Sequence, residues 1–219
     1  MKTRVKVFPE ITIFLIFLFP FVVQAQEKKN FQVINEISVS VNRTTLDNGN
    51  VSGRFGFGLG VYKSWRNESW FNIVAGASYQ KTGFFGKNVY NGHFSHVTDV
   101  DYNVHTVSVP VSIRLNVGRK TKFFLEPGAY LDLNLAGNRK GTFYSYAPGS
   151  PQAITVQKEK IRTPPPGAGF LAAVGSRIPV GNLNMVVKCE YKLGFSDWGA
   201  LQESLPNQYV VLSLGVQLR

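Results

Sequence analysis

Apolar and polar residues alternate along seven stretches of the chain, and the apolar positions of these stretches carry no charged residue. In 123–135 the odd-numbered positions are apolar from Phe123 to Leu135, whereas Glu126 and Asp132 occupy even-numbered positions. A period of two is typical of β-strands, whose successive side chains point to opposite faces. We therefore expect about eight strands, at 35–41, 54–64, 70–80, 102–117, 123–135, 168–178, 183–195 and 208–219.

Ionic residues on one face of nearly every strand favour a barrel with lipid outside and polar side chains in the lumen. Short connections such as 179–182 alternate with long ones at 42–53, 81–101, 136–167 and 196–207. Short periplasmic turns and long external loops are typical of outer-membrane barrels. The predicted fold class is all-β: an eight-stranded antiparallel up-and-down transmembrane β-barrel. A soluble lipocalin-like binding barrel, with apolar faces around a ligand, is the alternative.

The first 25 residues resemble a signal peptide. Lys2, Arg4 and Lys6 precede an apolar run over 11–23, and small residues follow near a cleavage site before Gln26. As a helix this run rises only about 20 Å, whereas a bilayer core needs about 30 Å, so cleavage is favoured over a membrane anchor. We expect a signal peptide at 1–25, a short periplasmic segment at 26–34 and an outer-membrane barrel at 35–219.

The net charge is +11 for the whole chain and about +9 without residues 1–25. Nucleic acid is an improbable partner, because an exported chain does not meet the genome and the basic residues form no single stripe. Anionic headgroups explain the charge better. The expected partners are outer-membrane lipid and lipopolysaccharide, the outer-membrane assembly machinery during insertion, and an envelope protein that the sequence does not identify.

Six charged residues share the parity that we assign to the lumen: Arg114, Glu126, Asp132, Lys188, Glu190 and Lys192. The interior of an eight-stranded barrel is only wide enough for side chains to fill. Since buried charges need partners, we expect these residues to form a satisfied ionic core. A gated ion path through the core is the alternative.

The connection at 136–167 is the longest, and exposed aromatic and basic residues on a loop are suited to binding a partner. The candidate partner-binding residues are Arg139, Lys140, Phe143, Tyr144 and Tyr146. A tolerated insertion without a ligand is an equal alternative.

Two further groups of residues are of interest. Aromatic residues near the strand ends predict two interfacial belts, one around Trp65, Trp70, Phe71, Phe123 and Phe124 and the other around Tyr79, Phe84, Phe85, Tyr102, Tyr191, Phe195 and Trp198. Candidates for a catalytic or metal site are His93, Ser95, His96, Asp99, Asp101, His105 and Ser108. Spacing alone shows no nucleophile–base pair, so we expect no enzyme, no metal and no cofactor. An outer-membrane lipid-modifying enzyme is the alternative.

The segment Val107 to Leu115, a basic turn, and the segment Phe123 to Leu131 together resemble the central hairpin of a known family. The family is that of the PorT-like outer-membrane β-barrel proteins of Bacteroidota, and the resemblance extends loosely over 26–219. It implies an eight-stranded barrel. Its founding member is linked to protein secretion and gliding-associated export, while most relatives have no assigned role. We therefore expect a structural or adhesive barrel, or a component of an envelope secretion or assembly system.

Overall fold

The structure is a computed structural model that describes residues 34–45, 51–65, 70–91, 95–145, 153–161, 163–197 and 206–218. The predicted signal peptide at 1–25, and residues 26–33 of the predicted periplasmic segment, lie outside these ranges. Within them no helix is long and apolar enough to cross a membrane. The strands in these ranges are β1 (Glu36–Thr44), β2 (Val51–Gly53), β3 (Phe55–Trp65), β4 (Phe71–Asn91), β5 (Ser95–Val117), β6 (Lys122–Ser145), β7 (Ala153–Ile161), β8 (Gly167–Val180), β9 (Leu183–Asp197) and β10 (Pro206–Leu218).

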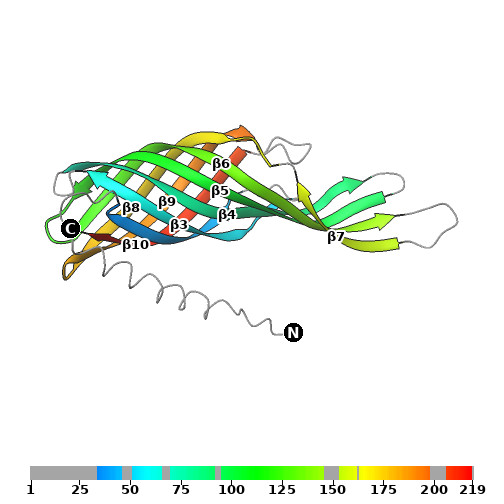
Figure 1. The fold of residues 1–219 in the computed structure, drawn as a ribbon, viewed down its shortest axis with the longest axis horizontal. Coiled ribbons are helices and arrows are strands. Elements are labelled where there is room, and N and C mark those ends of the chain that lie inside the picture. Colours follow the sequence, from blue (N-terminus) through cyan, green and yellow to red (C-terminus); the bar gives the residue numbers. More distant parts are fainter. Residues whose placement is uncertain are drawn as a thin grey trace. The chain divides into compact units, whose positions relative to one another are not determined.

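Eight of these strands form a closed antiparallel ring in the order β1, β3, β4, β5, β6, β8, β9, β10 (Figure 1). The ring closes because β1 pairs with β3 on one side and with β10 on the other, so that Val39 lies opposite both Leu59 and Leu214. β2 pairs with the second half of β4, and β7 pairs with the second half of β6. The predicted eight-stranded antiparallel barrel is confirmed.

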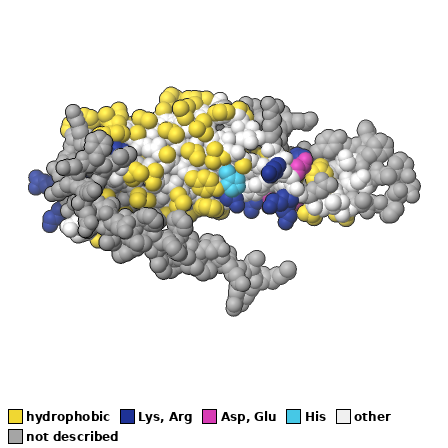
Figure 2. Space-filling model, in the orientation of Figure 1, with side chains coloured by type: hydrophobic (Ala, Val, Ile, Leu, Met, Phe, Trp, Pro, Cys, Tyr) yellow, Lys and Arg dark blue, Asp and Glu magenta, His cyan; other side chains and the backbone are white. Residues whose placement is uncertain are grey.

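Each strand of the ring has an apolar face that points outward. On β5, Val111 and Ile113 expose 53% and 50% of their surface. Ser112, which lies between them, and Arg114, which follows, are buried. Figure 2 shows many hydrophobic side chains on the visible face of the barrel. The parity predicted from the sequence therefore holds, with apolar residues outside and polar residues inside.

Glycines let one aromatic ring lie flat against the inner wall. Tyr62 of β3 is buried, and its ring covers Gly60 on the same strand and Gly76 on β4. A Cβ atom at Gly60 would lie 2.6 Å from Tyr62 Cε2, and one at Gly76 would lie 2.5 Å from Tyr62 Cδ1. The inner surface of this ring is covered in turn by Lys188, whose Nζ lies 5.1 Å from the ring centroid.

The long connections at 81–101 and 136–167 differ from the expected irregular loops. β4, β5 and β6 continue beyond the predicted strands as far as Asn91, Ser95 and Ser145, and β7 pairs with the extension of β6. The resulting hairpins, β4–β5 and β6–β7, project from one end of the ring (Figure 1). Apolar residues lie on the inner face here, while Asp101 and Asn103 face outward.

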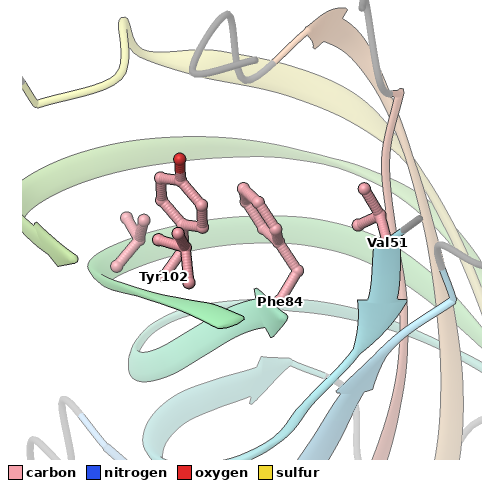
Figure 3. Packing of buried hydrophobic residues seen from close by; sticks show 5 residues of the cluster. Val51, Phe84 and Tyr102 are labelled. Carbon is pink, nitrogen blue, oxygen red and sulfur yellow. The ribbon is translucent and has the colours of Figure 1, made fainter. Parts of the chain in front are cut away.

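A small hydrophobic core explains why these extensions are strands. Phe84 and Tyr102 stack inside the barrel at a ring centroid distance of 4.5 Å, and Val51, Val100 and Val104 pack around them (Figure 3). The predicted placement of Phe84 and Tyr102 in an interfacial belt is therefore wrong, because both rings are buried on the inner face. A third predicted belt residue, Phe124, is likewise buried in the lumen.

Candidate functional site

The six charged residues predicted for the lumen are all buried there. Arg114 and Lys192 expose none of their surface, and even the most exposed of the six, Glu190, exposes only 5%. They lie on the paired strands β5 and β6 and on β9, which β8 separates from β6. The inward parity of these strands places the charges within reach of one another.

Arg114 is the centre of one half of this network. Its Nε donates a hydrogen bond to Glu126 Oε2 at 2.6 Å, and its two terminal nitrogens donate to the Glu36 carboxylate at 2.9 and 3.3 Å. Glu36 lies on β1, so the guanidinium joins distant strands of the ring across the lumen. The same guanidinium lies over the ring of Phe124, 4.5 Å from its centroid, which adds a cation–π contact.

Charges alternate along the inner face of β9. Lys188 contacts Glu190 at 2.9 Å and Glu126 at 3.7 Å, while Lys192 contacts Glu190 from the other side at 3.8 Å. Residues two apart on a strand point to the same face, which lets one acid lie between two lysines. Glu126 therefore links the network around Arg114 to the charges of β9.

Asp132 joins the network through a phenol. Lys192 Nζ donates to Ser108 Oγ at 2.7 Å and to Tyr209 Oη at 3.3 Å, and Tyr209 Oη donates to Asp132 Oδ2 at 2.7 Å. The ammonium group also lies 4.6 Å from the centroid of the Tyr130 ring. The rings replace part of the solvation that the lysine loses in the lumen.

Two charged members were not predicted. Glu36 has the inward parity of its strand, next to the outward Ile37, and this parity was the signal that could have identified it. Arg177 of β8 is also buried, and its terminal nitrogens donate to Gln217 Oε1 at 3.0 Å and to Asn116 Oδ1 at 2.7 Å. With these two the lumen contains four cationic and four anionic side chains among the described residues, so its net formal charge is zero.

Two of the residues considered for catalysis, His105 and Ser108, lie on opposite faces of β5. His105 faces outward, where Nδ1 lies 2.5 Å from Tyr79 Oη, whereas Ser108 faces the lumen and contacts Lys192. His96 packs on the ring of Tyr144 with centroids 4.6 Å apart. His93 lies outside the described residues.

The candidate partner-binding residues lie on a strand. Arg139, Lys140, Phe143 and Tyr144 belong to the outer part of β6, and Tyr146 lies outside the described residues. Arg139 forms an ion pair of 2.9 Å with Glu159 of β7. Lys140 is exposed on the opposite face of the sheet that β5, β6 and β7 form here.

The sequence profile described as outer membrane protein beta-barrel domain matches residues 24–198. No curated protein matches the chain.

Several solved structures of outer-membrane proteins are similar to the chain at low sequence identity. The attachment invasion locus protein Ail of Yersinia pestis is 14% identical, with a TM-score of 0.36 and coverage of 84% of this chain and 97% of Ail. Neisserial surface protein A is 12% identical, with a TM-score of 0.44 and coverage of 84% and 95%. The outer membrane enzyme PagL is 16% identical, with a TM-score of 0.33 and coverage of 84% and 98%. None of these three likenesses carries an argument about activity.

Proposed function

Because this chain belongs to the family of outer membrane protein beta-barrel domains, we propose that it is a closed, non-enzymatic barrel that holds two hairpins outside the membrane. In this proposal the barrel is a scaffold, and the hairpins β4–β5 and β6–β7 make the contacts. The role is structural or adhesive, or that of a component of an envelope secretion or assembly system. The observation that carries the proposal is the neutral ionic network that crosses the lumen.

The network supports a closed lumen on energetic grounds. Buried charges are tolerated when they are paired and hydrogen-bonded, and here Arg114 is shared between two carboxylates. An ion that entered the lumen would have to displace these contacts. In a barrel of eight strands the side chains leave little room for a column of water.

Three narrower statements belong to the same proposal. We propose that residues 1–25 are removed on export and that the mature chain begins near Gln26, as the basic and apolar regions of a signal peptide suggest. The central hairpin of β5 and β6 supports assignment to the PorT-like barrels of Bacteroidota. The partners that we propose for the protein are outer-membrane lipid and lipopolysaccharide, the assembly machinery and one envelope protein, with no nucleic acid.

A conductance measurement tests the closed lumen. The purified protein is inserted into planar lipid bilayers, and we expect no current steps. The intact mass of the same protein shows where the signal peptide is cleaved. Replacing Lys188 and Glu190 together by alanine removes a buried ion pair of 2.9 Å without changing the net charge. This double variant is expected to conduct, because two long side chains leave the lumen.

The matched control for the conductance test is the double variant Val187→Ala and Cys189→Ala. These residues alternate with the ion pair on β9 but face outward, so this control also shortens two side chains and is expected to remain closed. Heat-modifiable migration on gels shows that each protein is folded. Regular current steps from the folded wild-type barrel would contradict the proposal.

The absence of enzymatic activity has its own test. We expect identical lipid A mass spectra from a deletion strain, from the strain with the wild-type protein, and from a strain with Ser95, His96 and His105 each replaced by alanine. The reason is that the His105 imidazole faces outward and contacts the Tyr79 phenol, whereas the Ser108 hydroxyl faces the lumen and contacts Lys192, so these two residues form no Ser–His pair. A change in acyl chains or headgroups that requires the wild-type side chains would show an enzyme instead.

A further inference from the structure

The apolar outer surface of the barrel ends near the base of the hairpins. On β5 the outward residues are apolar from Val117 to Val107, and His105 and Asn103 follow. These ten residue steps, at about 3.4 Å each and a tilt near 45°, give a height of about 24 Å, close to the apolar band of outer-membrane barrels. On β4, Lys81 follows Tyr79 at the same level, because it pairs with His105.

Basic residues gather immediately beyond this edge. Figure 2 shows dark blue side chains where the hydrophobic surface ends, on the side of the hairpins. The register places Lys140 of β6 between Asp101 of β5 and Lys158 of β7, and it places Asn138 between Asn103 and Lys160. Residues directly opposite one another in an antiparallel sheet share a face. Lys140, Lys158 and Lys160 therefore form one exposed group.

The described residues provide few anions for this group. Asp101 already forms an ion pair of 2.8 Å with Arg54. Glu159 lies on the other face of β7 and pairs with Arg139 at 2.9 Å. Lys140 and Lys158 are thus like charges on directly opposed positions, an arrangement that destabilises a strand pair unless an anion lies between or above them.

We propose that this basic face binds the phosphate groups of lipopolysaccharide in the outer leaflet. The basic face consists of Lys81, Lys140, Lys158 and Lys160, with the side-chain amides of Asn103 and Asn138 beside them. The inference rests on the proposed membrane orientation, with the hairpins outside the cell.

Position and chemistry together select this ligand. Asp101, opposite Lys140, lies four residues beyond His105, which places the lysines about 10 Å above the apolar edge, at the depth of headgroups rather than in open solution. Lysine ammonium groups bind phosphate as mobile point charges on long stems, so they can follow a headgroup whose position varies. The neutral amides can bond with sugar hydroxyls.

A binding experiment with purified full-length protein in detergent micelles tests the assignment. The probe is lipid A with its phosphates, and the variant carries Lys140→Gln, Lys158→Gln and Lys160→Gln. A cation near an anionic membrane surface contributes about a fivefold factor in affinity, so the triple variant is expected to bind roughly a hundredfold more weakly. High salt is expected to weaken binding to the wild type and to have little effect on the variant.

The matched control removes three basic residues at the other end of the barrel, with Arg119→Gln and Lys120→Gln in the β5–β6 turn and Lys122→Gln at the start of β6. It is expected to bind lipid A as the wild type does. A second variant with arginine at positions 140, 158 and 160 is expected to retain binding, because it keeps the charges. Inorganic phosphate at equal phosphate concentration is expected to compete poorly, which distinguishes the lipid from a free anion.

Equal lipid A affinity of the glutamine variant and the wild type would overturn the inference. Equal affinity for dephosphorylated lipid A, or competition by inorganic phosphate as strong as that by lipid A, would overturn it as well. Heat-modifiable migration and flotation with lipid vesicles report separately on the barrel. A folded, vesicle-bound protein that fails the lipid A test leaves the proposed function intact, whereas a protein that neither shifts nor floats contradicts the proposed function itself.

Discussion

Replacing Arg114 by methionine is expected to lower the free energy of unfolding of the barrel by about 3–5 kcal/mol, the usual cost of leaving a buried charge without its partner. Methionine keeps most of the side-chain length, so the loss arises from charge and not from a large cavity. Glu36 and Glu126 would then remain buried in the lumen without the guanidinium that joins them. Urea titration in lipid vesicles, followed by tryptophan fluorescence, measures the change.

Two further variants isolate the electrostatic cause of this loss. Arg119→Met removes the same charge from the exposed turn between β5 and β6, and we expect little change there. Combining Arg114→Met with Glu36→Gln removes one uncompensated carboxylate, so part of the lost stability is expected to return. If Arg114→Met were as stable as the wild type, the network would not be holding the lumen together.

Replacing Val111 by arginine is expected to destabilise the barrel by about 2–4 kcal/mol in vesicles, because a cation on the lipid face near the bilayer midplane is costly. Val111 lies near the middle of the apolar row of β5 and exposes 53% of its surface. The cost arises because the surrounding hydrocarbon offers the guanidinium neither water nor an anion. The same vesicle unfolding measurement applies.

The same strand offers a matched control for depth. Val117 exposes 74% of its surface at the end of the apolar row, where an arginine reaches the headgroups. Val117→Arg is therefore expected to cost only about 0–1 kcal/mol. In a soluble barrel both valines would face water and both substitutions would be nearly neutral, so equal small effects would exclude the membrane orientation.

The ring and its orientation follow from local sequence. The side-chain period of a strand is two, so a charge-free parity on strand after strand reports which face meets hydrocarbon. Even 168–178, where Leu171 and Ala173 weaken the contrast, forms β8, with both residues facing the lumen. Both apolar side chains are buried in the lumen, so alternation alone does not show which face of this strand is inside.

The hairpins were missed because the apolar parity inverts along one strand. On β5, Val100, Tyr102 and Val104 face inward, whereas Val107 and the apolar residues after it face outward. Outside the hydrocarbon layer the solvent is water, so the barrel there has an apolar interior like that of a soluble protein. A strand that is predicted from one constant apolar parity therefore ends where the parity changes.

Parity indicated six of the eight buried charges of the lumen among the described residues, because alternation is a property of the chain itself. It could not show that Arg114 meets Glu36, 78 residues away, or that Tyr209 connects Asp132 to Lys192. Those contacts depend on how the ring closes and on the stagger between its strands, which are set by all eight strands together. Lys140 and Lys158 lie side by side because of the register of the β6–β7 hairpin, and this register has no signature in the spacing of its residues.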